Sequence, residues 1–311
     1  MQVFFLALFL ALFPGCTRTE PGHEAPRKSQ SDGAPRLVSF APSNTELVYS
    51  VGAEDCLIAV SSNCKYPPAV LQKPIAGSFL SAKFEKLTAL KPDLALLVSG
   101  QEGLATQLDK FSIQNQVLPN KKLGDISTNL KTLGIICHKE KRAQQVSADF
   151  DKALMEFQTI LSDCPRERIL FCVWTDPSIC VGGESFLDDV ITACGAINTT
   201  AEFKSSYPKL TAEKIISSKP DLLVLPHEVE VDVKENQAQI LSRPPWSSLN
   251  AVKSGRVIYL PEAKSDHLSR PTLRILTGLH WLSTRLHPDK SAALDRWLKS
   301  NDYLILSRDK H

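Results

Sequence analysis

The sequence predicts an α/β protein with two Rossmann-like lobes, each built on a largely parallel sheet, joined by a single long helix. One observation is a repeat: Leu-Lys-Pro-Asp-Leu-Ala-Leu-Leu at 90–97 returns as Ser-Lys-Pro-Asp-Leu-Leu-Val-Leu at 218–225, an offset of 219 − 91 = 128 residues. That period is too long for a solenoid and suits a duplicated domain. The other observation is one long amphipathic segment over 139–164, between the two copies.

The first lobe is predicted over 36–138, where short apolar runs alternate with segments of helical pattern. The apolar runs lack polar alternation, which indicates strands covered by helices on both faces. Ser43-Asn44-Thr45-Glu46 has the pattern of a capping box at the start of the first helix. The predicted strands cover 37–40, 57–60 and 94–98, and a second helix covers 84–90.

The linking helix is predicted over 139–164. Its apolar residues recur every three or four positions, at Val146, Phe150, Leu154, Phe157 and Leu161, which is the pattern of an amphipathic helix. Cys164-Pro165 ends it. A single helix as the only connection restrains hinge motion, whereas several extended strands would permit wide closure.

The second lobe is predicted over 165–311, with strands over 169–174 and 222–225 and a short helix over 211–217. Ser185 is the expected cap of another helix, with Asp188 at the third position. Lys91-Pro92 and Lys219-Pro220 each end a helix, because the residue before proline avoids the helical conformation. The two Lys-Pro-Asp segments are therefore predicted to be the same helix-to-strand corner in two similar lobes.

The N-terminus carries an apolar run over 3–13, which is too short to span a bilayer but has the length of a signal-peptide core. Pro14-Gly15-Cys16 follows. This arrangement resembles a bacterial lipoprotein signal, which implies a signal peptide over 1–15 and lipidation at Cys16. The alternative is a plain secretory signal with an incidental cysteine. The polar stretch over 16–35 is predicted to be a flexible tether.

The composition excludes some partners and cofactors. A net charge of +2, without a dense basic tract, gives no reason to expect nucleic acid. Seven cysteines remain besides Cys16, and none forms a Cys-x-x-Cys pair, so a zinc or iron–sulfur site is not expected. Cys172 and Cys180 flank a turn at Asp176-Pro177 and are the first candidates for a bridge; buried thiols are the default for the others.

Several segments together resemble the substrate-binding proteins of ABC importers for cobalamin, haem and iron–siderophores, most closely the cobalamin branch. The resemblance runs from Arg36 to about Leu286. It implies two α/β lobes of the class III binding-protein type, a small molecule held between them, a permease–ATPase partner and an extracytoplasmic location. The segments are Ser39-Phe-Ala-Pro-Ser-Asn-Thr-Glu46, Tyr66-Pro-Pro68, Phe84 to Asp93, Gly182 to Asp188, Pro245 to Arg256 and Asp266-His-Leu-Ser-Arg270.

The resemblance also implies ligand-contacting positions. Phe79 and Tyr207 stand where the cobalamin proteins carry tryptophans, Asn63 stands where a tyrosine is expected, and the loop over 266–270 closes one side. These departures predict a smaller or differently shaped site. Tyr66 is a further candidate for the cleft wall. The predicted set is Asn63, Tyr66, Phe79, Tyr207, Asp266, His267 and Arg270.

Two glutamates and one histidine have alternative interpretations. Glu85 and Glu213 lie at equivalent positions, each eight residues before the aspartate of its repeat (93 − 85 = 221 − 213 = 8). The family analogy makes them carboxylates that dock on permease arginines; favourable interaction with a helix dipole is the plainer alternative. His267 is either a solvent-facing histidine or an axial ligand for haem iron or cobalt.

No nucleophile–base, zinc-protease or paired-carboxylate motif is present, so catalysis is not expected. The sequence predicts a monomeric, lipid-anchored, extracytoplasmic protein without a resident cofactor or metal, which binds cobalamin or a related corrinoid and delivers it to an ABC permease. A ferric siderophore or haem is the alternative ligand. An enzyme or sensor on the same scaffold is the alternative from another functional class.

Overall fold

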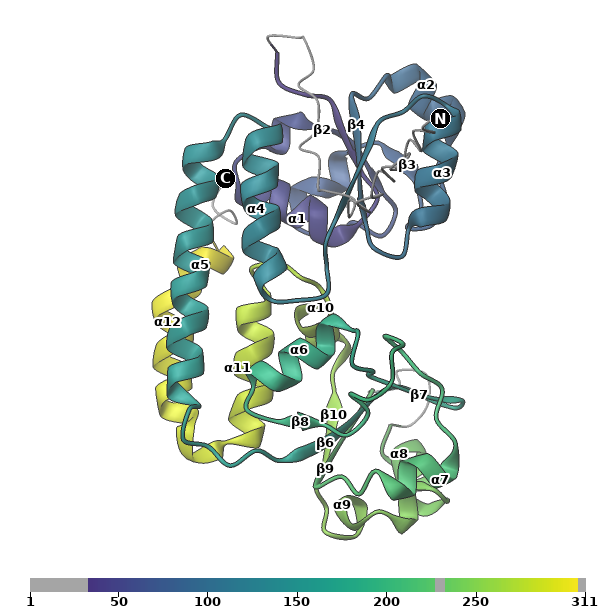
Figure 1. Cartoon of the computed structure of the whole chain (residues 1–311), viewed down its shortest axis with the longest axis vertical. Helices are drawn as coiled ribbons and strands as arrows, with labels where there is room; N and C mark the ends of the chain where they lie inside the picture. Colours follow the sequence, from purple (N-terminus) through teal and green to yellow (C-terminus); the bar gives the residue numbers. More distant parts are fainter. Residues whose placement is uncertain (1–32, 227–232, 307–311) are drawn as a thin grey trace, which may run out of the picture.

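Two α/β lobes stacked along the long axis of the molecule, with a group of long helices along one side, make up the fold (Figure 1). The computed structural model describes residues 33–226 and 233–306. Cys16, the signal segment and nearly all of the predicted tether lie outside the described residues. In the described part of the chain, no helix is long and apolar enough to cross a membrane.

A five-stranded sheet in the order β3-β2-β1-β4-β5 forms the centre of the N-terminal lobe. Each neighbouring pair is parallel. The fully buried β4 is flanked by helices, as its continuous apolar sequence predicts. The strands are β1 (Leu37–Ser39), β2 (Leu57–Ser61), β3 (Ile75–Gly77), β4 (Leu94–Val98) and β5 (Asn115–Leu118), with helices α1 (Pro42–Ser50), α2 (Phe84–Leu90), α3 (Glu102–Lys110) and α4 (Gly124–Ile136).

The C-terminal lobe has a mixed sheet in the order β10-β9-β6-β7, with β8 also paired to β6. All of its pairs are parallel except β6–β7, which is an antiparallel hairpin. The strands are β6 (Arg168–Thr175), β7 (Ser178–Cys180), β8 (Ile197–Asn198), β9 (Leu222–Pro226) and β10 (Val257–Leu260), with helices α6 (Phe186–Ala193), α7 (Ala212–Ser217), α8 (Val233–Ser242), α9 (Asn250–Lys253) and α10 (Glu262–Ser269).

The linking helix α5 (Glu140–Ile160) packs against α12 (Ser291–Leu306), which in turn packs against α11 (Ile275–Leu286), along one side of the molecule (Figure 1). It ends slightly earlier than the segment 139–164 predicts. The indole of Trp297 on α12 donates to the carbonyl of Ala153 at 2.8 Å, and its ring lies 4.8 Å from that of Phe157. The connection between the lobes is therefore thickened by helices from the C-terminal end of the chain.

The two Lys-Pro-Asp corners are built alike, as their sequences predict. Asp93 accepts the backbone N–H of Arg36 at 2.8 Å, and Asp221 accepts that of Arg168 at 2.9 Å. In each corner the arginine side chain also donates to carbonyls at the end of the preceding helix. Each corner lysine has a positive φ, 45° at Lys91 and 42° at Lys219. The sequence repeat therefore corresponds to the same helix-to-strand corner in both lobes.

One predicted helix start is wrong in detail. Ser185 does cap α6, because its hydroxyl accepts the N–H of Asp188 at 3.2 Å. At α1, however, the capping residue is Ala41, Pro42 follows inside the helix, and no side chain caps the helix. Proline has no N–H and suits the first helical position. The carboxylate of Glu46 is therefore free to point away from the helix.

Candidate functional site

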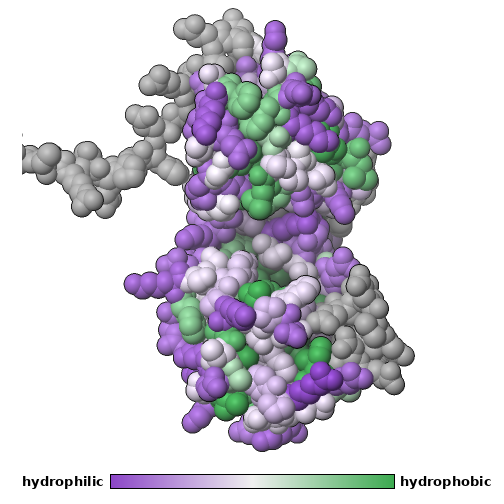
Figure 2. All heavy atoms as spheres, turned by 90° about the vertical axis from the view of Figure 1, so that its right-hand side faces the viewer, coloured by the Kyte–Doolittle hydropathy of each residue, from purple (hydrophilic) through white to green (hydrophobic). Residues whose placement is uncertain are grey.

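The cleft between the lobes is the candidate ligand site. The connections that follow β1, β2 and β3 in one lobe and β6 and β10 in the other lie toward the boundary between the lobes (Figure 1). Open parallel sheets bind ligands outside the carboxyl ends of their strands. The molecule narrows between the lobes on the side opposite the long helices, as the space-filling view shows (Figure 2).

An apolar cavity of about 280 Å³ opens in the C-terminal lobe at these strand ends. Tyr207, 46% exposed, forms part of its wall, so its ring is available to a ligand. The position of Tyr207 agrees with its predicted role, although ligand contact stays a prediction. Other wall residues are Phe171, Val173, Leu187, Leu260 and Leu268.

The segment that leads to Tyr207 is held by close backbone contacts. The N–H of Gly182 donates to the carbonyl of Ser206 at 2.9 Å. A Cβ atom at Gly182 would lie 1.9 Å from the carbonyl oxygen of Ser205, which no side chain tolerates. The Gly182-Gly183 pair is therefore a tight corner, and it also positions the segment that carries Tyr207.

Phe79, in the N-terminal lobe, lies in the loop after β3 and is held through its backbone. Its N–H donates to the Oδ1 of Asn63 at 2.9 Å, and its carbonyl accepts the side-chain amide of the buried Gln101. Asn63 thus supports the loop that carries Phe79. A residue predicted to touch the ligand has a positioning role in this structure.

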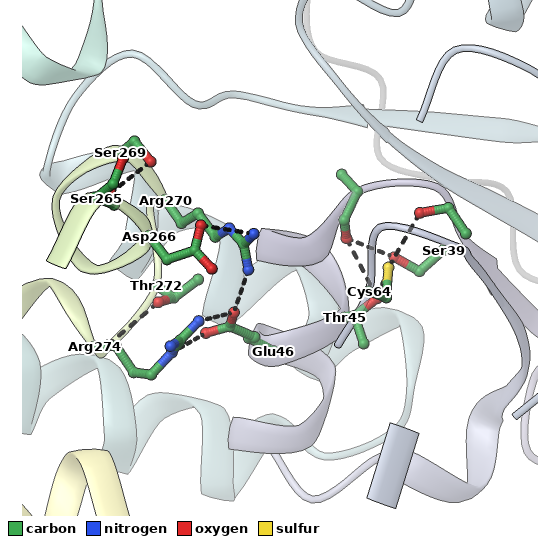
Figure 3. A network of polar contacts seen from close by, with 12 residues as sticks. Ser39, Thr45, Glu46, Cys64, Ser265, Asp266, Ser269, Arg270, Thr272 and Arg274 are labelled. Atoms are coloured by element: carbon green, nitrogen blue, oxygen red, sulfur yellow. Dashed lines mark hydrogen bonds and ion pairs between the residues drawn. The ribbon is translucent and has the colours of Figure 1, made fainter. Parts of the chain in front are cut away.

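A buried ionic network joins the two lobes beside the cleft (Figure 3). Glu46 on α1, 3% exposed in its side chain, accepts two hydrogen bonds from Arg274, Nε–Oε2 at 2.8 Å and Nη2–Oε1 at 2.5 Å. Arg270 lies 3.7 Å from the same carboxylate and 2.8 Å from Asp266. A bidentate arginine–carboxylate pair is both strong and directional. The network therefore sets how the lobes meet.

Tyr66 belongs to this network. The guanidinium of Arg274 lies 4.1 Å from the centre of the Tyr66 ring, within the range of a cation–π contact. Tyr66, predicted as a cleft-wall residue, thus contacts the arginine of the opposite lobe.

His267 is kept neutral by its surroundings. Burial, together with the positive charges of Arg274 and Lys264, lowers the pKa of His267 to about 4. Its Nδ1 atom is buried and has no hydrogen-bond partner. Close packing fixes its helix, since a Cβ at Gly278 of α11 would lie 2.8 Å from the carbonyl oxygen of His267. His267 is half-buried, and its assignment as an axial ligand or as a histidine at the lip of the cleft stays a prediction.

A second polar contact between the lobes lies nearer the surface. Lys122 lies 3.1 Å from Asp189 at the start of α6, and that carboxylate accepts the N–H of Leu123 at 2.7 Å. A cavity of about 470 Å³ opens next to it, among residues of α4, α5 and α6. It is larger than the cavity in the cleft, but none of the predicted ligand residues lines it and it is away from the strand ends.

Glu85 and Glu213 are exposed in the first turns of α2 and α7. Hydrogen bonds from its own backbone N–H and from Thr211 lower the pKa of Glu213. Both carboxylates are open to a partner, and their docking role stays a prediction. Among residues 33–226 and 233–306, no group of three or more His, Cys, Asp or Glu side chains is placed to hold a metal ion.

Glu46, Arg274 and Gln101 were not predicted as site residues. Glu46 and Arg274 are separated by 228 positions, and no local pattern pairs them. The one available signal was a charged residue after three uncharged polar residues at the start of a helix. It pointed to a capping box because the spacing to Ser43 fits that motif.

Comparison with known proteins agrees with this geometry. A family model described as "Periplasmic binding protein" matches residues 37–263. The vitamin B12-binding protein of Vibrio parahaemolyticus is 26% identical over 248 residues, covering 78% of this chain and 86% of the relative. An uncharacterised ABC transporter substrate-binding lipoprotein of Bacillus subtilis, YvrC, is 28% identical over 265 residues, covering 82% and 80%.

Solved structures show the same fold. The periplasmic vitamin B12-binding protein BtuF of Vibrio cholerae matches with a TM-score of 0.69 and 25% identity, covering 81% of this chain and 96% of that one. The periplasmic haem-binding protein RhuT of Roseiflexus matches with a TM-score of 0.68 and 19% identity, covering 83% and 100%. The predicted α/β class and the two-lobe binding-protein architecture are confirmed.

These relatives are transport components that work outside the cytoplasm, and they are not enzymes. The family match covers most of the chain. The chain belongs to the periplasmic binding protein family, as a substrate-binding protein of an ABC transporter.

Proposed function

We propose that this protein binds cobalamin or a related corrinoid in the cleft between its lobes and delivers it to an ABC permease. The observation that supports the ligand best is the apolar cavity beside Tyr207, combined with relatives that are named for vitamin B12 binding. A planar macrocycle has two large apolar faces. Phe79 and Tyr207, one from each lobe, would cover them at small entropic cost.

Two positions bear on the shape of the site, because Phe79 and Tyr207 stand where the resembled cobalamin proteins carry tryptophans. Phenylalanine and tyrosine carry smaller rings than tryptophan, so the walls of this cleft would differ in shape from walls built of two indoles. Asp266 and Arg270, paired at 2.8 Å, would face the polar periphery of the corrin ring.

Haem is the second candidate, and His267 favours it. A neutral imidazole with an unpartnered nitrogen has the chemistry of an axial ligand to iron. A ferric siderophore would instead be recognised by charge, through Arg270, which is the more exposed of the two network arginines.

Absorbance titration of the purified apo-protein separates these ligands. Cyanocobalamin, haem and a ferric siderophore are added separately, and binding is followed by spectral change and by calorimetry. We expect saturable one-to-one binding of cyanocobalamin, weakened in Tyr207→Ala and unaffected by Leu71→Ala on an exposed 3-10 turn. A haem spectrum that changes on His267→Ala would establish haem instead, and no binding of any of the three would refute the assignment.

Docking on the permease is proposed to use Glu85 and Glu213. The double variant Glu85→Lys/Glu213→Lys should bind ligand normally but fail to stimulate the cognate transporter, because exposed charges orient the encounter. The matched control is Glu102→Lys, an exposed first-turn glutamate of α3. Transport that is unchanged in the double variant would rule out this docking role.

Attachment to the membrane through Cys16 is proposed as well, with the folded part acting as a monomer. Cys16→Ser should release the exported protein into the soluble fraction, whereas the wild type should partition with membranes. A wild type that is soluble after export would favour the plain secretory signal.

A further inference from the structure

The β6–β7 hairpin contains two cysteines, neither of which is among the predicted ligand-contacting residues. Cys172 on β6 and Cys180 on β7 are cross-strand partners in the antiparallel ladder. Their sulfur atoms lie 2.7 Å apart and both side chains are fully buried. The structure contains them as unlinked thiols.

The backbone around this pair has the geometry that a disulfide requires. The N–H of Val181 donates to the carbonyl of Phe171 at 2.9 Å, while the N–H of Cys180 donates to Pro208 at 3.1 Å. Cys172 and Cys180 therefore form a non-hydrogen-bonded pair, in which opposite Cα atoms lie about 4.5 Å apart. Disulfides accept Cα separations of about 4.4–6.8 Å, so no backbone movement is needed.

The compartment supplies the oxidant. A periplasmic binding protein works outside the cytoplasm, where disulfides form and persist. We propose that Cys172 and Cys180 are joined by a disulfide in the exported protein. One cysteine thiolate attacks the disulfide of an extracytoplasmic oxidoreductase, and the second displaces it. The two cysteines lose two protons and two electrons, and the oxidoreductase leaves as its dithiol.

The bond forms before the hairpin is buried. Desolvation raises the pKa of the Cys172 thiol well above its usual value, so the folded protein offers no reactive thiolate. Exchange must take place while the hairpin is still open. In the folded protein the same burial protects the disulfide from reductants.

The disulfide would hold one wall of the ligand cavity. Phe171, Cys172 and Val173 line the cavity of about 280 Å³. β7 is a short edge strand, joined to β6 and, by a single bridge, to Lys209. A covalent link between β7 and β6 would hold β6, the strand whose residues line this cavity, in place.

The first test is a thiol count on the full chain, exported into the periplasm of a bacterial host. The intact mass should be lower than the fully reduced mass by two hydrogen atoms. Alkylation in guanidinium chloride should label two more cysteines after reduction than before, and peptide mapping should join the segments of Cys172 and Cys180. The same number of labelled cysteines with and without reductant would overturn the proposal.

The chain offers a matched control pair. Cys56 and Cys137 are also buried, and their side chains hydrogen-bond to each other. Cys56→Ser/Cys137→Ser should retain the difference of two thiols, and Cys172→Ser/Cys180→Ser should lose it. A difference that disappears in the first variant and persists in the second would assign the bond elsewhere. The wild-type peptide map identifies the bonded pair even if a variant fails to fold.

Hydrogen exchange supplies an independent measurement. Amides of β7 should exchange more slowly in the exported protein than in protein purified reduced, and this gap should vanish in Cys172→Ser/Cys180→Ser. Equal exchange rates in both preparations would contradict the proposal that a disulfide fixes β7 to β6. None of these readouts involves a ligand, so a failed thiol count is distinct from a failed cobalamin titration.

Discussion

In both lobes an arginine, Arg36 or Arg168, binds the end of a helix while an aspartate accepts that arginine's backbone N–H. The corners are alike down to the positive φ of the lysine. At the cleft the lobes differ. The N-terminal lobe presents Phe79 on an amide-supported loop, and the C-terminal lobe presents an apolar cavity with Tyr207 in its wall.

This difference shows where a duplicated scaffold is able to change. The outer corner satisfies backbone groups at a helix end and a strand start, and a change there leaves buried polar groups unpaired. The loops at the strand ends do not have to pair the backbone groups of a helix end, so their side chains can change more readily. One lobe therefore supplies a charged anchor, Glu46, and the other supplies the arginines and the apolar pocket.

The largest effect is expected from breaking the buried ion pair between Glu46 of the N-terminal lobe and Arg274 of the C-terminal part of the chain. Arg274→Met leaves the buried Glu46 carboxylate with only the more distant Arg270. Loss of one partner of a buried ion pair typically costs about 3–5 kcal/mol. We expect the free energy of unfolding to fall by about 3 kcal/mol, measured by urea denaturation.

Two variants control this measurement. Glu46→Gln/Arg274→Met should be more stable than Arg274→Met alone, because no uncompensated charge stays buried. Lys122→Ala, at the more exposed Lys122–Asp189 contact, should cost less than about 1 kcal/mol. If Lys122→Ala costs as much as Arg274→Met, the buried network is not the main contact between the lobes.

The next largest effect concerns the two aromatic walls. Tyr207→Ala should weaken cyanocobalamin binding by about 2 kcal/mol, roughly 30-fold, because it opens the cavity that buries the ligand. Phe79→Ala should cost about half as much, since Phe79 does not line that cavity. Calorimetric titration measures both. A larger loss of binding free energy in Phe79→Ala than in Tyr207→Ala would mean that Phe79 makes the stronger contact with the ligand.

A smaller effect is expected from His267, because acid stability depends on its neutral ring. Its pKa is about 4 in the fold and about 6.5 in an unfolded chain. The unfolded state binds the extra proton first, so stability is lost as the pH falls from about 6.5 to about 4. Partial exposure limits the loss to about 1–2 kcal/mol.

His267→Gln removes the titrating group and should flatten the stability profile over that range. Urea denaturation at a series of pH values compares it with the wild type. Equal slopes in the two proteins would mean that the imidazole does not charge on unfolding.

The smallest effect tests the likeness of the lobes directly. Asp93→Ala and Asp221→Ala each remove one acceptor of a backbone N–H, at 2.8 and 2.9 Å. Each should lower the free energy of unfolding by about 1 kcal/mol, and by similar amounts. Unequal losses, with one above about 2 kcal/mol, would show that the corners differ in function despite their geometry.

The fold could be predicted further than the site. The Lys-Pro-Asp repeat and the pattern of α5 depend on local backbone preferences and periodicity, which the sequence displays directly. The cap at Ser185 was predicted for the same reason. Glu46 was misassigned because a local motif and a distant ion pair use the same residue type.

Asn63 and His267 show the same limit within the site. Their family positions predict ligand contact, which stays a prediction. The structure adds that Asn63 accepts a backbone N–H and that burial and nearby cations keep His267 neutral. Neither environment can be read from neighbours in the chain, because the groups that create it come from other elements.

By itself the sequence determined the duplicated α/β lobes, the rigid helical link and the family, since these follow from short-range patterns and from the order of motifs. Only the tertiary structure decided that Glu46 meets Arg274 and that the cavity beside Tyr207 lies in one lobe. The reason is physical. Charge pairing, cavities and cross-strand contacts depend on distances between segments that the chain brings together only when both lobes have packed against α5.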